Sequence, residues 1–447
     1  MTSIGIDIGT TSISAVLVEI NSGKVLKSIT VSNKTDMSSN GEEHLQDPEK
    51  IFNKVRAIID EIIEFNNVQC IGLAGQMHGI VYVSNKGESA SPLYTWMHSG
   101  GNEPYKDTTY AEYLSSLTNH DVSSGYGFVT LFYHKEKGIR QNNLGFCSIG
   151  DYVAMRLTGR KHPVVHVSNA HSFGLFDLDK STFDADAVLM SGVDVVLPDV
   201  EKGNVIVGYY RGIPVSIALG DNQASFLGSV NDMENTVLFN MGTGSQISYM
   251  SRSKEPDCNM EVRPLINDLY LQVGCSLCGG SAINVLEKFF SRIIKDICNS
   301  DFDEYSYINI LIDRILNKNE ELTLEVSTMF KGTRANPNLR GSITNINFDN
   351  FTPENLLNGF VHGMVYELYD LYAGTKRKHS KLVGAGNGFY MNSLMPKVVG
   401  KTFGMDVYAP VHKEQTAYGA ALFAIYSAGL YNSMEECQKM IGYKALG

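Results

Sequence analysis

The sequence lacks several features that would each define a class of protein. It has no run of Lys or Arg, and 37 basic residues against 48 acidic ones give a net charge of −11. Nucleic acid binding needs a concentrated basic surface, which this composition does not predict. No stretch approaches the roughly 20 apolar residues of a membrane span. Residues 1–12 contain neither the basic nor the apolar region of a secretory signal. We therefore expect neither a nucleic acid partner nor a membrane.

Cysteine is also scarce, with seven residues scattered over a chain of 447. An odd number at irregular spacing does not suggest a disulfide framework. Cys275 and Cys278 are spaced like a metal or redox pair, but no second pair completes a zinc site and no thioredoxin-like context surrounds them. We expect both to be small core residues in a reduced, cytoplasmic protein.

The residues that are present predict a folded α/β protein. The chain is 43% hydrophobic and 19% charged, which argues against disorder. Residues 3–8 and 13–19 read as two strands joined by a Gly-Thr turn, which predicts a hairpin. Asp47 and Pro48 are typical of a helix start, and a buried-strand composition follows at 70–74. Strands and helices alternate in this way along the chain, as in mixed α/β layers.

The pattern of strand, Gly-Thr turn and strand occurs twice. The second turn begins at Gly242, which is 233 residues after Gly9 (242 − 9 = 233), or about half the chain. This period is too long for a solenoid. We expect two related α/β domains, residues 1–217 and 218–447, the second beginning at the apolar run 214–219.

Both turns could hold phosphate groups. Glycine lets backbone N–H groups approach phosphate oxygens, and threonine hydroxyls stand beside the glycines of both turns. A single turn of this kind is more often a plain hairpin, but two copies in matching positions favour a triphosphate held from both sides. Asp7 precedes the first turn and could bind Mg²⁺ directly or through water. The alternative is a strand-end Asp that accepts hydrogen bonds from the turn.

Asp221 follows the apolar run 214–219 and precedes a helical pattern. Position alone favours a simple helix cap. Its place at the start of the second half also suits a general base, because a sugar hydroxyl that attacks a phosphate must lose its proton.

Polar side chains follow the buried strand at 70–74. Gln76, Met77 and His78 lie at the carboxyl end of that strand, where ligands bind in α/β sheets. A lone histidine is more often structural, so binding and structural roles are about equally favoured. Trp96, the single tryptophan, is either core or an apolar wall for a sugar.

A Gly-rich turn follows the strand that begins at Lys381. Its spacing is GxGxG, and no βαβ unit accompanies it, so we exclude a nicotinamide site. Bare backbone at such a turn could instead receive a flat adenine, with Asn387 and Asn392 as hydrogen-bonding partners.

Together these segments resemble the FGGY carbohydrate kinases, over essentially the whole chain and in the same order. The segments are Asp7–Thr11, Gly75–Gly79, Gly220–Gln223, Asn240–Thr243, Gly384–Asn387 and Gly419–Ala421. The resemblance implies an α/β fold of two RNase H-like domains, as in the sugar kinase, Hsp70 and actin family, with a cleft between them.

The resemblance also implies ATP and Mg²⁺ as cofactors and assigns roles to particular residues. Asp221 would be the catalytic base, and Asp7 and Asp221 would hold the metal. The sugar would contact Gln76, Met77, His78, Trp96, Asp221 and Asn222. The nucleotide would contact Thr10, Thr11, Gly242, Thr243, Gly280, Gly384, Gly386, Asn387 and Asn392.

Within the family, several segments resemble sedoheptulokinase, and a xylulokinase or another pentulose kinase is the alternative. Relatives usually carry an Asp two residues after the tryptophan, where this chain has His98, and another before a Ser-Asn-Ala run, where it has His166. These replacements leave the sugar open. A non-catalytic, nucleotide-dependent sugar sensor is the alternative of another class. The expected partners are a ketose and ATP, with a homodimer left open.

Overall fold

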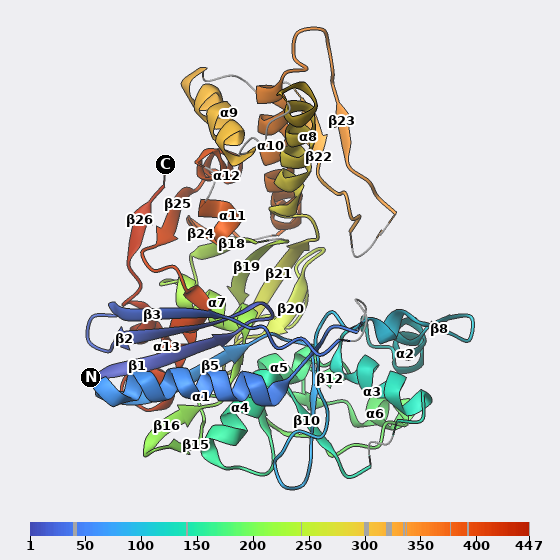
Figure 1. The fold of residues 1–447 in the computed structure, drawn as a ribbon, viewed down its shortest axis with the longest axis vertical. Helices are drawn as coiled ribbons and strands as arrows, with labels where there is room; N and C mark the ends of the chain where they lie inside the picture. Colours follow the sequence, from blue (N-terminus) through green and yellow to red (C-terminus); the bar gives the residue numbers. More distant parts are fainter. Residues whose placement is uncertain are drawn as a thin grey trace.

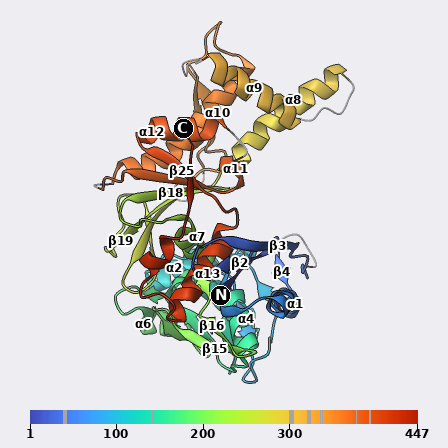
Figure 2. The ribbon, with the colours of Figure 1, turned by 90° about the vertical axis from the view of Figure 1, so that its left-hand side faces the viewer.

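The computed structural model describes residues 1–38, 43–139, 142–242, 244–298, 304–318, 324–333, 336, 338–375, 377–390 and 393–446. The chain forms two lobes, each built on a mixed β-sheet (Figure 1). Figure 2 shows the same two lobes from the side, with α8, α9 and α10 at the end of the second lobe farthest from the first. The N-terminus lies in the first lobe and the C-terminus in the second.

The first sheet confirms the first predicted hairpin, because β1 and β2 pair antiparallel around the Gly-Thr turn. In order across the sheet, the strands are β15 (Ile206–Tyr210), β16 (Ile213–Ser216), β5 (Val68–Gly75), β1 (Thr2–Ile8), β2 (Ser12–Glu19) and β3 (Val25–Ser32), and β17 (Leu219–Gly220) also pairs with β5.

The second sheet confirms the second predicted hairpin, formed by β18 and β19. Its order is β20 (Glu261–Pro264), β21 (Tyr270–Ser276), β19 (Ser245–Ser251), β18 (Thr236–Met241), β24 (Lys381–Ala385), β25 (Asp406–Pro410) and β26 (Tyr443–Ala445).

The two sheets share one topology, as the repeated sequence pattern predicts. In the first, β1 is antiparallel to β2 and parallel to β5. In the second, β18 is antiparallel to β19 and parallel to β24. In the first sheet, β3 pairs antiparallel with β2 and β16 pairs parallel with β5. In the second, β21 pairs antiparallel with β19 and β25 pairs parallel with β24. The turns at Gly9 and Gly242 therefore occupy equivalent places.

The prediction that the apolar run 214–219 begins the second half is wrong. Val215 pairs with Ile71, and Leu219 pairs with Ala74, so β16 and β17 complete the first sheet. An apolar run identifies a buried strand but does not say which sheet receives it. The division of the chain between residues 217 and 218 stays a prediction.

The helices surround these sheets. They are α1 (Pro48–Phe65), α2 (Tyr110–Thr118), α3 (Gly127–Glu136), α4 (Ile149–Thr158), α5 (Val167–Ser172), α6 (Ala185–Ser191), α7 (Asp221–Ser229), α8 (Ser281–Cys298), α9 (Glu304–Lys318), α10 (Pro353–Ala373), α11 (Asn387–Tyr390), α12 (Leu394–Phe403), α13 (Gln415–Ser427) and α14 (Met434–Gln438). The predicted start of α1 is confirmed, because the Asp47 side chain accepts hydrogen bonds from two N–H groups of its first turn.

Pairs of short strands lie outside the two main sheets. They are β4 (Leu45–Gln46) with β7 (Leu93–Tyr94), β6 (Val81–Val83) with β10 (Gly145–Cys147), β8 (Pro104–Tyr105) with β9 (Thr108–Thr109), β11 (Val164–His166) with β14 (Asp199–Glu201), β12 (Phe176–Asp177) with β13 (Thr182–Phe183), and β22 (Glu325–Ser327) with β23 (Ser342–Thr344). A 3₁₀ turn covers Ser99–Asn102.

Two helices, α7 and α13, cross at backbone contact distance. A Cβ atom on Gly228 of α7 would lie 2.1 Å from the carbonyl oxygen of Gln415, and one on Gly419 of α13 would lie 1.8 Å from that of Ala224. Only glycine allows this approach. In the same way Gly5 of β1 admits the backbone of α13, so the last long helix of the chain packs against the first sheet. This packing fixes the start of α7, where Asp221 lies.

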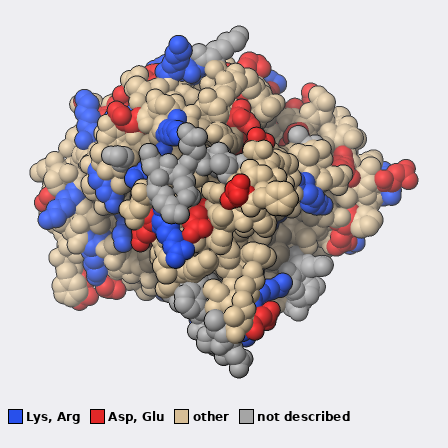
Figure 3. Space-filling model, turned by 90° about the horizontal axis from the view of Figure 1, so that it is seen from above, with Lys and Arg blue, Asp and Glu red and all other residues tan. Residues whose placement is uncertain are grey.

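The surface shows no concentrated charge on the face seen in Figure 3, where Lys and Arg lie interspersed with Asp and Glu. Within the described residues, no helix combines the length and the apolar character needed to span a bilayer.

Candidate active site

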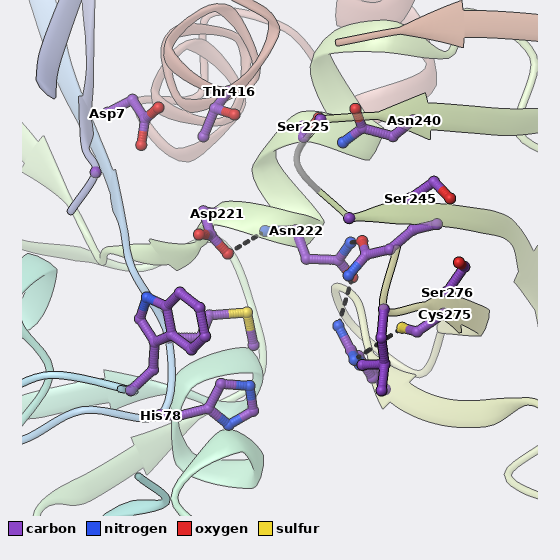
Figure 4. A pocket seen from close by; sticks show the side chains of 18 of the residues that line it. Asp7, His78, Asp221, Asn222, Ser225, Asn240, Ser245, Cys275, Ser276 and Thr416 are labelled. Carbon is purple, nitrogen blue, oxygen red and sulfur yellow. Dashed lines mark hydrogen bonds between the residues drawn. The ribbon is translucent and has the colours of Figure 1, made fainter. Parts of the chain in front are cut away.

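A cavity of about 650 Å³ lies between the lobes, at the ends of β1, β5, β17 and β18 (Figure 4). Its lining comes from both halves of the chain: Asp7, Gly9, Met77, His78, Trp96, Asp221, Asn222, Ser225, Asn240, Gly242, Gly244, Ser245, Gln246, Arg263, Cys275, Ser276, Leu277, Lys331 and Thr416. The ends of parallel strands meet here, which is where α/β proteins bind ligands.

Asp7 and Asp221 line this cavity and influence each other electrostatically. Loss of hydration raises the pKa of Asp7 to about 8, with further contributions from the negative charges of Asp221 and Glu414. Loss of hydration likewise raises the pKa of Asp221 to about 6, although its hydrogen bond from the Asn222 N–H and the charge of Arg263 oppose this rise. The site thus holds two buried carboxylates whose pKa values stay raised, although the charge of Arg263 partly offsets the rise at Asp221.

These carboxylates fit a magnesium ion. One oxygen of Asp7 is buried and accepts no hydrogen bond within the described part of the chain. Among the described residues, no three His, Cys, Asp or Glu side chains are grouped so as to enclose a metal. Mg²⁺ is usually held by one or two carboxylates while phosphates and water complete its shell. The donor set therefore suits a metal that arrives with a nucleotide better than a structural ion.

Hydrogen bonds connect the first turn to Gln46, Gln76 and Trp96. The Thr10 hydroxyl accepts a bond of 3.1 Å from the Trp96 indole N–H and donates one of 3.2 Å to Gln76. Gln46 in turn bonds to the Thr10 carbonyl and accepts from Gln76. Gln76 and Thr10 are absent from the cavity lining, within the described residues, so their part is to hold the turn. Thr11, next in the turn, is exposed and also lies outside that lining.

His78 and Met77 follow β5 and reach the cavity. His78 has a φ of 70°, an unusual left-handed conformation for a residue with a side chain. Its N–H donates to the Ser172 hydroxyl, its Nδ1 lies 2.8 Å from the Ser172 carbonyl, and its ring stacks on Tyr126. Trp96 is 48% exposed and lines the same side. The predicted sugar-facing residues Met77, His78 and Trp96 are thus brought together.

A polar row faces them from the start of α7 and the second lobe. Arg263 donates to the Asn222 side-chain oxygen, and the Asn222 amide donates to Gln246 at 2.9 Å. Arg263 is only 6% exposed and also pairs with Glu261 at 2.8 Å. Sequence reasoning missed Arg263, which lies outside the recognised motifs, and Gln246, which directly follows the second Gly-Thr turn in β19.

The second turn is built from closely packed glycine backbone. The Gly242 carbonyl accepts from the Gly280 N–H at 3.0 Å, and Gly242 and Gly244 line the cavity. Gly280 therefore bonds to the backbone of the turn, and within the described residues it does not line the cavity. The predicted residue Thr243 lies outside the described residues, as does Asn392.

The Gly-rich turn after β24 lies beside the second Gly-Thr turn. A Cβ on Gly386 would lie 2.3 Å from the Met241 carbonyl, one residue before Gly242. Gly384 is covered by the Phe389 ring, so its backbone is not bare on that side. Asn387 begins α11 and is exposed. Within the described residues, none of these lines the cavity itself.

The two histidines found at unusual positions do not line the cavity, among the residues described. His98 is 8% exposed and bonds through Nδ1 to the Glu43 carbonyl, within a cluster of Tyr94, Tyr133 and His134. His166 is fully buried at the start of α5.

The CxxC pair divides between two environments. Cys278 is 1% exposed, as a small core residue should be. The same prediction is wrong for Cys275, whose side chain lines the cavity 3.7 Å from an Arg263 nitrogen. Cys275 lies near the end of β21, where Ser276 and Leu277 also line the cavity, whereas Cys278 lies beyond the strand.

Comparisons with known proteins agree with this architecture. The model of the FGGY family of carbohydrate kinases, N-terminal domain, matches residues 2–228. Sedoheptulokinase from Mus musculus is 25% identical, with 94% of this chain and 96% of that protein covered. Xylulose kinase from Staphylococcus epidermidis is 22% identical, with coverages of 97% and 89%.

Solved structures share the fold. Gluconate kinase from Lactobacillus acidophilus superimposes with a TM-score of 0.82 at 18% identity, covering 99% of this chain and 92% of that one. Plasmodium falciparum glycerol kinase with ADP gives a TM-score of 0.78 at 14% identity, with coverages of 98% and 92%.

Proposed function

This chain belongs to the FGGY family of carbohydrate kinases, and we propose that it transfers the γ-phosphoryl group of ATP to a terminal hydroxyl of a ketose, with sedoheptulose preferred. The similarity to sedoheptulokinase over nearly the whole of both chains supports this choice of sugar. Xylulose is the alternative, supported by the xylulose kinase relative.

The observation that carries the proposal is that one cavity unites two glycine turns from opposite lobes with a desolvated carboxylate. Gly9 and Gly242 line it from the two hairpins, and Asp221 lines it from the start of α7. Phosphoryl transfer depends mostly on positioning and on neutralising charge, so the chemistry needs little beyond these parts.

Asp221 is the proposed base. Burial raises its pKa to about 6, so the carboxylate is still ionised near neutral pH yet binds a proton more readily than a hydrated Asp. The Asn222 N–H donates to one of its oxygens, which leaves the other to accept the proton of the sugar hydroxyl.

Charge on the phosphates is met by cations that line the cavity. Asp7 and Asp221 would hold Mg²⁺, which neutralises the negative charge that builds on the transferred group. Among the described residues, Arg263 and Lys331 are the basic side chains of the lining. Arg263 is already paired with Glu261, so Lys331, which is exposed, is the more available of the two.

The sugar would lie between His78, Met77 and Trp96 on one side and the polar row of Asn222 and Gln246 on the other. Figure 4 shows His78 and Asp221 on one side of the cavity and Ser245, Cys275 and Ser276 across from them. An apolar wall opposite amide groups suits a chain of hydroxyls, which offers C–H faces and hydrogen-bonding edges.

Two measurements test this proposal. ADP release measured over a panel of ketoses, aldoses and aldonates should be fastest with sedoheptulose, and equal ADP release with and without sugar would contradict it. Asp221→Asn should lower turnover by roughly 10²–10⁴-fold while ATP affinity stays close to that of the parent. Asp199→Asn, an exposed carboxylate of β14, is the control. A nucleotide-dependent sensor would instead bind sugar and ATP without turnover in the parent protein.

A further inference from the structure

The short helix α5 is hydrogen-bonded at one end to the residue before the proposed base and at the other to the sugar-facing histidine. At its C-terminal end, the Ser172 hydroxyl accepts a hydrogen bond from the His78 N–H at 3.0 Å. The Ser172 carbonyl lies 2.8 Å from His78 Nδ1. Ser172 therefore bonds to both the backbone N–H and the ring of His78.

At its N-terminal end, α5 holds the strand that precedes Asp221. The Ser168 hydroxyl accepts from the Gly220 N–H at 3.0 Å, and the Asn169 amide donates to the Ala218 carbonyl at 3.2 Å. These bonds restrain the backbone of Ala218 and Gly220, the residues on either side of Leu219. Strand β17 is only two residues long and pairs only with β5 among the described strands, so side chains supply much of its restraint.

The hydroxyl of Ser168 is itself oriented by His166. The Ser168 N–H donates to His166 Nδ1 at 3.2 Å, which makes that nitrogen an acceptor, and the Ser168 hydroxyl lies 2.8 Å from it. The hydroxyl therefore gives its proton to His166 and keeps a lone pair for Gly220. Burial lowers the pKa of His166 to about 3, so the imidazole stays neutral and remains an acceptor.

Asn169 is anchored by a buried carboxylate. Its amide lies 3.2 Å and 3.3 Å from the two oxygens of Asp151, and the Ser148 hydroxyl donates to the same carboxylate at 2.6 Å. Asp151, Asn169 and Ser148 are each 1% exposed. These hydrogen bonds restrain the Asn169 amide nitrogen, while its Oδ1 is buried and accepts no hydrogen bond within the described residues.

We propose that α5 is a positioning element that sets the catalytic base and the sugar-facing histidine relative to each other. Ser168 and Asn169 fix the backbone that carries Asp221, and Ser172 fixes His78. A displacement of about 1 Å in a reacting group can cost about 100-fold in rate, so hydrogen bonds one layer away from the substrate matter to turnover. This inference rests on the proposed role of Asp221 as base.

The two ends of α5 predict two different kinetic signatures. Ser168→Ala should lower kcat about 10-fold or more with little change in the KM for sugar, because the base moves while the sugar contacts stay. Ser172→Ala should raise the KM for sugar about 10-fold with a smaller change in kcat. Asn169→Ala is a second variant for the Ser168 end. Ser191→Ala, at a buried serine of α6 whose hydroxyl donates to the Val188 carbonyl and accepts from the Val193 N–H, is the control and should keep both parameters.

The stoichiometry of ATP binding, measured by calorimetry, reports the folded fraction of each variant. Equal kcat and KM changes in Ser168→Ala and Ser172→Ala, or parent-like kinetics in both, would overturn the inference. If Asp221→Asn abolishes turnover while Ser168→Ala and Asn169→Ala leave it intact, the proposed function stands and only the role of α5 fails. If Asp221→Asn keeps full turnover, the proposed function and this inference fail together.

Discussion

At the scale of single residues, motifs identify the ends of strands but not the direction of each side chain. Gln76 and His78 belong to one motif, yet His78 lines the cavity while Gln76 is buried and bonded to Gln46 and Thr10. Cys275 was expected in the core and instead faces the cleft. Whether a side chain lines the cavity or is buried depends on which face of the strand end meets the other lobe. That arrangement is determined by distant parts of the chain.

The position of Cys275 predicts selective chemical inactivation. An alkylating agent such as iodoacetamide should add bulk inside the cavity at Cys275 and reduce turnover at least 10-fold, because the group would occupy space beside Arg263. The sugar and ATP should slow this reaction. Turnover followed during alkylation, with mass spectrometry to locate the adduct, checks the expectation.

Cys275→Ser supplies the comparison for this experiment. It should retain most activity and resist the reagent, while the exposed Cys258 is still modified in both proteins. Equal inactivation of the parent and Cys275→Ser would show that another thiol is responsible.

At the scale of elements, local sequence patterns predict individual strands and helix starts, but they do not predict which distant strands pair. Both Gly-Thr hairpins and the start of α1 follow from a few neighbouring residues, and the structure confirms them. The run 214–219 was correctly read as buried strand but assigned to the wrong sheet. Its partner β5 lies about 140 residues earlier in the chain (215 − 71 = 144), and no local pattern encodes that pairing.

The crossing of α7 and α13 predicts a severe effect of adding one methyl group. In Gly419→Ala the new Cβ would lie 1.8 Å from the Ala224 carbonyl oxygen, so the helices must separate. Overpacking of this kind typically costs about 1–3 kcal/mol and sometimes more. Because α7 begins at Asp221, turnover should fall as well. Urea unfolding midpoints and kcat measure the two effects.

Gly203→Ala is the matched control for the crossing. Its Cβ would meet only the Asn267 side chain, at 3.5 Å, which is an ordinary contact. A Gly419→Ala protein as stable and as active as Gly203→Ala would show that the helices can separate without moving the base.

At the scale of the whole molecule, the sequence predicted the duplicated architecture because the two hairpins recur half a chain apart, and the shared sheet topology confirms it. The cavity between the lobes could be predicted only in outline. Asp7, Gly9, Asp221 and Gly242 were identified because they end strands in recognisable motifs. Arg263, from β20, was not, because its place opposite Asn222 results from how the two lobes meet.

The burial of Asp7 between the lobes predicts that its negative charge lowers the stability of the ligand-free protein although turnover requires it. Its carboxylate loses hydration in the cavity and lies near the negative charges of Asp221 and Glu414, which raises its pKa to about 8. Asp7→Asn removes that charge and keeps the shape of the side chain. Without ligands, the variant should therefore unfold at a higher temperature than the parent, while Mg²⁺-dependent turnover is largely lost. Calorimetric unfolding and ADP release measure the two effects.

The pH dependence of this stability difference identifies its cause. A folded-state pKa above the ordinary value of 3.8 means that the parent loses stability as pH rises from about 4 through about 8, while the Asn variant has no such loss. The advantage of Asp7→Asn should thus be small near pH 5 and reach its full size above pH 8. An advantage that stayed constant with pH, or that grew toward acid, would mean that packing rather than the buried charge is responsible. Asp199→Asn, which changes an exposed carboxylate, should show neither the stabilisation nor the loss of turnover.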